Sequence, residues 1–262
     1  MSRLTHFALP VLSLRAISVW RRNFLVWKKL AVPSLLGNLA DPMIYMFGLG
    51  YGLGSMLPAV NGQPYIAFLA AGTLCASTMN AATFEALYSA FSRMHVQKTW
   101  EALLYAPLSL DDVVAGEWLW AASKSMLSGT AILCVITALG FVHSPLALWV
   151  LPVVFLTGLA FAALGLIVNA LAPSYDFFMY YFTLAITPMT LLSGVFFPLE
   201  RLPAVAQGVA YCLPLTHAVA VVRPLVNGVV PEALFVHLGV LAAIAVLAFW
   251  LALGLTRRRL LR

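Results

Sequence analysis

Few side chains in this sequence could carry chemistry, and those few are far apart. It contains no GxxxxGK[ST] phosphate-binding loop, no HExxH zinc motif and no GxSxG nucleophile motif. The three cysteines, at positions 75, 134 and 212, match no metal-ligand spacing. No two of the five histidines lie within one helical turn; they are His6, His95, His143, His217 and His237. We therefore expect no catalytic residue, no metal site and no cofactor on this chain.

Four ionisable residues lie in or beside apolar stretches and are candidates for a transport pathway or for structural roles: Asp41, Glu85, Asp176 and His217. Asp41 precedes Pro42, which is the pattern of a helix N-cap and a first helical residue, so we expect a helix to begin there. Glu85 lies about 30 Å along a helix from Tyr65 and is expected to be an interfacial carboxylate. A lone histidine such as His217 is expected to be a hydrogen-bonded packing residue.

The elements that position these residues must be membrane helices. Of the 262 residues, 63% are hydrophobic and 9% are charged, whereas soluble domains carry about 25% charged residues. A helix needs about 20 mostly apolar residues to cross a bilayer, and no polar stretch is long enough for a separate domain. We predict one all-α, polytopic domain over residues 1–262, with six spans. Their ranges are 42–60, 65–91, 118–141, 146–171, 177–197 and 234–255.

Lys and Arg cluster in residues 1–31, 93–124 and 257–262. The positive-inside rule produces such a distribution, so we interpret the net charge of +6 as topology and attraction to membrane lipid rather than nucleic-acid binding. An even number of spans places both termini on one side. The basic ends predict that this side is the cytoplasm, with Arg262 inside and Arg201 and Arg223 outside.

Two segments beside the spans have a pattern of their own. In residues 11–31, apolar residues recur every three or four positions and basic residues occupy the other faces, which predicts an amphipathic helix on the membrane surface. The apolar face consists of Leu14, Ile17, Trp20, Phe24, Trp27 and Ala31. Residues 198–231 contain five prolines between apolar runs of about ten residues, which are too short to span. We expect a re-entrant pair of short helices there, at the external face.

The polar loop 93–117 is expected to be ordered. Its pattern predicts a short helix over 97–105, and Ser109 followed three residues later by Asp112 resembles a capping signal for the next helix. The side chains of Trp100, Leu103 and Leu104 are then available to pack, either on the bundle itself or on a partner.

Four strings carry a family resemblance: LGNLADPMIYMFGLGYGLG (36–54), TWEALLYAPLSLDDVVAGE (99–117), NALAPSYDFF (169–178) and LLSGVFFPLERLP (191–203). Together with the arrangement of the spans, they resemble the type-2 ABC transporter permeases over nearly the whole chain. The first two strings are most similar to a narrower group within that family.

The resemblance implies a homodimeric permease in a bacterial inner membrane, joined to two copies of a separate ATPase subunit that binds the ATP. The implied cargo is an amphiphile such as a lipo-oligosaccharide, a polysaccharide or a drug. Loop 93–117 would be the coupling loop that docks on the ATPase, and residues 172–176 a smaller contact. The coupling residues are Thr99, Trp100, Glu101, Leu103 and Leu104.

Two alternatives from other classes are an ion-coupled carrier and an integral membrane enzyme that acts on lipid. The scarcity of intramembrane ionisable groups disfavours the first. The second would need a cluster of polar groups inside the bilayer, which the sequence does not indicate.

Overall fold

The computed structural model describes residues 7–57, 59, 60, 62–142 and 144–261, and these residues are almost entirely helical. The predicted cytoplasmic Arg262, as well as His6 and His143, lie outside them. Apart from one isolated β-bridge between Val60 and Gln63, the described part of the chain contains no β-structure. The all-α prediction is confirmed.

Four rods are long and apolar enough to cross a membrane: Tyr65–Val96, Leu110–Ala138, Pro145–Leu171 and Leu234–Leu260. They contain α3 (Tyr65–Phe84) with its π-helical continuation, α5 (Leu110–Ala138), α6 (Val150–Leu171) and α11 (Leu234–Leu260). The helix α6 is apolar on all sides and packs against the other three. Close approach depends on small residues: a Cβ on Gly158 would lie 2.1 Å from Ser125 Oγ, and one on Gly165 would lie 2.8 Å from Ala86 Cβ.

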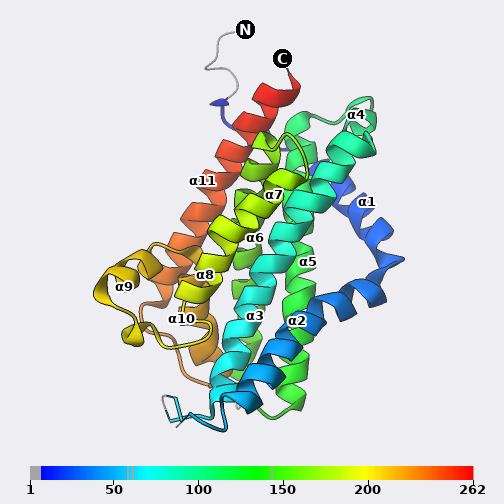
Figure 1. Cartoon of the computed structure of the whole chain (residues 1–262). Coiled ribbons are helices and arrows are strands. Elements are labelled where there is room, and N and C mark those ends of the chain that lie inside the picture. The colour runs from blue at the N-terminus through cyan, green and yellow to red at the C-terminus, as the bar shows by residue number, and fades with distance from the viewer. Residues whose placement is uncertain (1–6, 58, 61, 143, 262) are drawn as a thin grey trace.

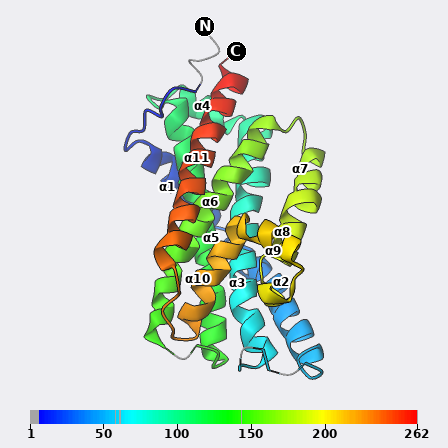
Figure 2. The same cartoon turned by 90° about the vertical axis from the view of Figure 1, so that its left-hand side faces the viewer.

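Two further helical rods run beside this bundle (Figures 1 and 2). One is α2 (Ala31–Gly52); the other consists of α7 (Asp176–Tyr181), the π-helical segment Phe182–Ile186 and α8 (Thr187–Leu192). Unlike the four long rods, neither is both long enough and apolar enough to be recognised as a membrane span. The count of six spans therefore stays a prediction.

The prediction that a helix begins at Pro42 is wrong. The helix α2 runs without interruption through Pro42, and the chain breaks earlier, at Leu30, so Asp41 does not cap a helix. Pro42 has no N–H and leaves the carbonyl of Asn38 without its helical donor. The hydroxyl of Ser77 on α3 donates to that carbonyl at 3.3 Å, which is how a neighbouring helix makes an internal proline tolerable in a membrane.

The segment before the last rod contains α9 (Ala204–Tyr211) and α10 (Pro214–Val226). These two short helices are bent by 88° at the break between them, and together they are apolar enough to form a broken span or a re-entrant loop. Two short helices were expected in 198–231, and they are present. Their depth in a bilayer stays a prediction.

Within the predicted range 11–31 the structure has the helix α1 (Ala16–Lys28), whose aromatic side chains pack on the bundle. Its location on a membrane surface stays a prediction. Trp20 Nε1 donates to Ser123 Oγ on α5 at 2.9 Å. The rings of Phe24 and Trp27 lie 6.3 Å and 5.8 Å from the ring of Trp120. The predicted membrane-facing aromatic stripe is therefore used to pack α1 on α5, because Trp120 offers it an aromatic partner there.

The two ends of the described chain lie at one end of the bundle, together with α4 (Thr99–Leu104) (Figure 1). The N-terminal segment is held to that end by charged side chains: the backbone N–H of Val11 donates to Asp111 at 2.8 Å, and Arg257, which also contacts Asp111, donates to the carbonyl of Ala8 at 2.7 Å. The connections at the opposite end turn at Gly140 and Gly228, where the backbone φ is positive.

Candidate functional site

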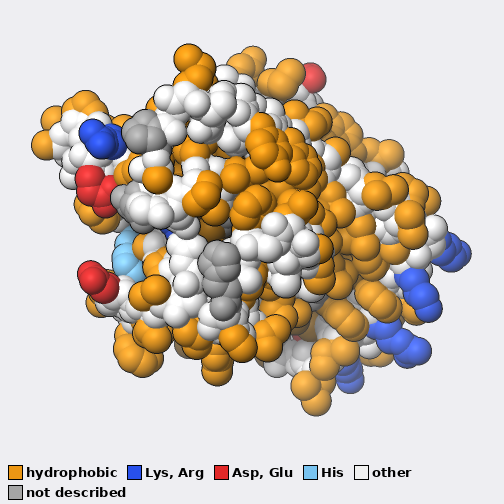
Figure 3. All heavy atoms as spheres, turned by 90° about the horizontal axis from the view of Figure 1, so that it is seen from below, with side chains coloured by type: hydrophobic (Ala, Val, Ile, Leu, Met, Phe, Trp, Pro, Cys, Tyr) orange, Lys and Arg blue, Asp and Glu red, His pale blue; other side chains and the backbone are white. Residues whose placement is uncertain are grey.

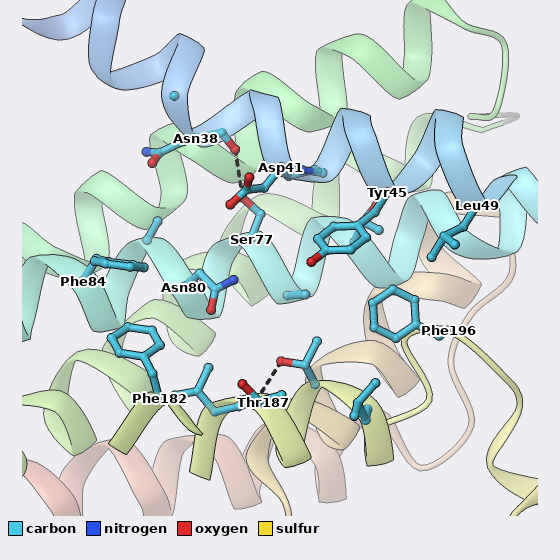
Figure 4. Close-up of a pocket in the computed structure, with 18 residues that line it drawn as sticks. Asn38, Asp41, Tyr45, Leu49, Ser77, Asn80, Phe84, Phe182, Thr187 and Phe196 are labelled. Carbon is cyan, nitrogen blue, oxygen red and sulfur yellow. Dashed lines mark hydrogen bonds between the residues drawn. The ribbon is translucent and has the colours of Figure 1, made fainter. Parts of the chain in front are cut away.

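A pocket of about 480 Å³ lies between α2, α3 and the α7–α8 rod (Figure 4). We call it the lateral pocket. Its aromatic lining residues are Tyr45, Phe84, Phe182 and Phe196, and its neutral polar ones are Asn38, Thr73, Ser77, Asn80, Thr187 and Thr190. Asp41 is the one acidic residue in the lining. Such a surface suits a ligand that has both hydroxyl groups and apolar parts.

Aromatic rings close the lateral pocket at both ends (Figure 4). The ring centroids of Phe84 and Phe182 are 4.6 Å apart at one end. At the other end, the ring centroids of Tyr45 and Phe196 are 5.8 Å apart, and the rings meet edge to face. Between them, Asn80 points into the space from α3, opposite Thr187 on α8. The pocket thus places polar groups in the middle and apolar rings at the ends.

Departures from α-helix begin at one aromatic end of the pocket. The π-helical segment Glu85–Ser89 follows Phe84 directly, and the segment Phe182–Ile186 begins with the opposing ring. π-helical turns are frequent at functional sites. The amide of Asn169 on α6 donates at 2.8 Å to the carbonyl of Ala86, so a neighbouring helix gives the first of these segments a hydrogen-bond partner.

Directly beside Phe84, Glu85 belongs to a buried ion network. It is 3% exposed, and its carboxylate pairs with Arg93 at 2.8 Å and with Lys124 at 2.7 Å. Arg93 also pairs with Glu117 at 2.5 Å. Glu85 is enclosed by protein and paired with cations from the π-helical segment Ser92–Val96 and from α5, and its depth in a bilayer stays a prediction. The Glu85 carboxylate is therefore fully engaged by the two cations in this structure.

Comparison with known proteins identifies the family. A family profile described as ABC-2 type transporter matches residues 15–227, most of the chain. The chain belongs to the ABC-2 type transporter family. It is 52% identical over 254 residues to "Nodulation protein J" of Rhizobium leguminosarum bv. viciae, covering 97% of this chain and 98% of the relative. The protein of that name in Rhizobium meliloti (strain 1021) is 51% identical over 254 residues, covering 97% of each chain.

A more distant relative is "Inner membrane transport permease YadH" of Escherichia coli (strain K12), which is 26% identical over 236 residues, 89% of this chain and 91% of that one. The resemblance inferred from the four strings is thereby confirmed, including its narrower group. As an ABC-2 permease, the chain is a transporter subunit with no catalytic role of its own. Its described residues contain no group of three or more His, Cys, Asp or Glu that could hold a metal ion.

The short helix predicted over 97–105 is present as α4, with Lys98 in a left-handed conformation just before it. Its role in coupling to an ATPase stays a prediction. Trp100 was predicted as a residue for partner contact, but it is 2% exposed, and its indole N–H donates to Glu117 at 3.1 Å. The bundle itself therefore accounts for Trp100, because its ring is buried and its N–H has an acceptor inside the bundle. Thr99 and Leu103 are half-buried.

The residues that α4 and the position after it leave exposed are Glu101, Leu104 and Tyr105, and Tyr105 is 93% exposed. The sequence argument missed Tyr105, although an aromatic residue in an otherwise ordered polar loop was a usable signal. The expected cap is confirmed: Ser109 and Asp112 form a reciprocal capping box at the start of α5.

The two remaining candidates lie away from the lateral pocket. Asp176 is exposed in the first turn of α7. His217 is buried, and its Nε2 donates to the carbonyl of Tyr211 at 3.0 Å, which leaves its Nδ1 to accept from Nδ1 of His237 at 2.8 Å. The expected hydrogen bonds of His217 are present, and its role as a packing residue stays a prediction. The fold thus brings together two histidines that are twenty positions apart and does not bring together Asp41, Glu85, Asp176 and His217.

Proposed function

We propose that this ABC-2 permease is the membrane subunit of an ATP-driven exporter, and that an amphiphilic lipo-oligosaccharide passes through the lateral pocket. The observation that carries the proposal is the lining of the pocket. The apolar faces of sugar rings and an acyl chain would pack on the aromatic ends, and hydroxyl groups would bond to the Asn, Ser and Thr side chains between them. Relatives named Nodulation protein J support a role in nodulation.

The energy would come from two copies of a separate ATPase subunit, because the sequence has no phosphate-binding loop. The exposed residues Leu104 and Tyr105 would be the contact made by α4. When ATP closes the ATPase pair, movement of α4 would pass through Trp100 to Glu117 on α5. From there Arg93 leads to Glu85, the neighbour of Phe84 in the pocket wall. ATP can drive transport only if its binding favours one of the two permease conformations.

A second copy of the chain would complete the transport path. The pocket opens between α2 and the α7–α8 rod, and both carry large exposed apolar side chains on the described surface, among them Ile44, Tyr51, Met179 and Leu184. We place the homodimer contact there. We also propose a bacterial inner membrane location with both termini in the cytoplasm, which the basic clusters and the name of the Escherichia coli relative support.

The test uses the permease reconstituted with its ATPase in lipid vesicles. We expect acylated oligosaccharides to stimulate ATP hydrolysis, and the same sugars without the acyl chain to stimulate it less. Phe182→Ala and Tyr45→Ala should each reduce this stimulation about tenfold or more. Phe235→Ala and Tyr211→Ala are matched controls, because they remove the same two kinds of ring from exposed positions outside both the pocket lining and the proposed dimer contact.

Stimulation by a small ion and by no amphiphile would favour the ion-coupled carrier instead, as would transport that stops when the proton gradient collapses while ATP is intact. Equal losses in the pocket and control variants would remove the lateral pocket from the transport path. A permease that altered lipid covalently without ATPase would indicate the membrane enzyme.

A further inference from the structure

The outward face of α1 forms a second, shallow hollow, of about 390 Å³. Its lining residues recur every three or four positions, so they share one side of the helix. They are Ser18, Arg21, Arg22, Leu25, Val26 and Lys29. Figure 3 shows Lys and Arg side chains gathered at the right-hand edge of the molecule, the side on which α1 lies in Figure 1. Three cations and two aliphatic side chains therefore share this outer face.

This face is the one left over after α1 has packed. Val19 and Asn23, on the other side of the helix, are buried against the bundle, and the aromatic stripe contacts α5. Leu25 and Val26, in contrast, are about half exposed. The aromatic residues that would ordinarily insert a surface helix into a bilayer are occupied, so the basic and aliphatic outer face is what α1 offers to its surroundings.

The cations of this face have no acidic partner among the residues that the structure describes. Arg21 and Lys29 form no ion pair there, and Arg22 donates only to the side-chain oxygen of its neighbour Asn23, at 2.9 Å. Partial burial, and then the like charge of Arg93, lower the pKa of Arg22, although Glu117 opposes this. A bound anion would offset the effects of burial and of Arg93 on Arg22. By contrast, Arg93 and Lys124 in the bundle are both paired with carboxylates.

We propose that the outer face of α1 is a binding site for the headgroup of an anionic phospholipid. The guanidinium groups of Arg21 and Arg22 and the ammonium of Lys29 bind the phosphate oxygens, for which the planar fork of arginine is well suited. Leu25 and Val26 contact the upper part of an acyl chain, so the site needs a phosphate and an apolar chain together. Charge complementarity selects this occupant, since clustered Lys and Arg beside a membrane attract anionic lipid. The proposal does not depend on the cargo.

The experiment counts lipids that stay bound to the purified full chain. The chain is taken from nanodiscs of equal parts phosphatidylglycerol and phosphatidylcholine into detergent, and the retained lipid is measured by native mass spectrometry. We expect the wild type to keep phosphatidylglycerol selectively. The triple variant Arg21→Gln, Arg22→Gln, Lys29→Gln should lose this selectivity, with an apparent affinity on the order of a hundredfold lower.

The matched control removes the same number of charges from exposed positions outside the hollow, through Lys28→Gln, Arg201→Gln and Arg258→Gln, and should retain the lipid. If the first triple variant does not purify as a monodisperse protein, Ser18→Glu serves instead, because it adds a negative charge to the hollow without removing a cation. That variant should also lose phosphatidylglycerol.

Three results would overturn the proposal: equal retention by the wild type and the variants of the hollow, equal loss in the control, or no preference for phosphatidylglycerol over phosphatidylcholine. A triple variant that keeps the lipid but no longer binds the ATPase would likewise overturn it, and would make this face a protein contact.

Discussion

Replacing Glu85 by glutamine should destabilise the bundle far more than the same replacement at Glu101. Both carboxylates lie 2.7 Å from a lysine ammonium, Glu85 from Lys124 and Glu101 from Lys98. The two pairs differ in burial: the side chains of Lys98 and Glu101 are 63% and 59% exposed, whereas that of Glu85 is 4% exposed and that of Lys124 is 19% exposed. The comparison therefore isolates the effect of removing the pair from water.

The size of the stability loss in the Glu85→Gln variant follows from the charges that remain. Without the Glu85 carboxylate, Arg93 keeps Glu117, but Lys124 has no other carboxylate within ion-pair distance among the described residues, and the indole N–H of Trp120 loses a charged acceptor at 2.8 Å. Breaking a buried pair by removing one partner costs about 3–5 kcal/mol, whereas an exposed pair is worth about 1 kcal/mol at most. At about 2–4 °C per kcal/mol, the Glu85→Gln variant should melt roughly 6–20 °C lower.

The assay is thermal unfolding in detergent, followed by the loss of the monodisperse peak in size-exclusion chromatography. The variant Glu85→Gln with Lys124→Met restores the balance of charge and should recover more than half of the lost melting temperature. Equal shifts for Glu85→Gln and Glu101→Gln would refute the argument from burial. Strictly additive shifts in the double variant would show that the two side chains are not coupled.

Three further outcomes are expected. Gly72→Ala should lower the free energy of unfolding by about 1–3 kcal/mol, because the new Cβ would lie 2.4 Å from the backbone oxygen of Val195. Gly48→Ala is the control, since nothing lies within 4 Å of a Cβ there. Thermal unfolding measures both variants. Tyr105→Ala should weaken ATPase pull-down about tenfold at normal yield, whereas Trp100→Ala should lower the folded yield itself, since its ring is buried. A cysteine placed at Arg201, with the native cysteines removed, should react with an impermeant reagent from outside intact cells, and labelling only after lysis would reverse the topology.

Local sequence was sufficient wherever neighbours along the chain decide the structure. The capping box of Ser109 and Asp112 and the short helix α4 follow from side chains three or four residues apart, and both are present. The long apolar rods follow from composition over about 20 residues. The bent pair of α9 and α10 follows from prolines that interrupt apolar runs.

The errors occurred where a distant residue changed the balance. A helix start at Pro42 was the reasonable local interpretation, but Ser77 on α3 supplies the missing donor and allows α2 to continue. Trp100 was predicted to contact a partner, but its indole N–H donates to the carboxylate of Glu117 within the bundle. In each case the deciding partner lies 17 or more positions away in the sequence, beyond the reach of any periodic pattern.

By itself, the sequence determined the class, the family and most of the helices, because hydrophobic length, charge clustering and family strings are properties of contiguous residues. Only the tertiary structure decided which side chains share a space. The lateral pocket draws its lining from α2, α3, the α7–α8 rod and the segment that follows, so no local spacing identifies it. No local spacing identifies the ion network around Arg93 or the outer face of α1 either. Which side chains are buried, and which stay exposed, is fixed only when the helices pack against each other.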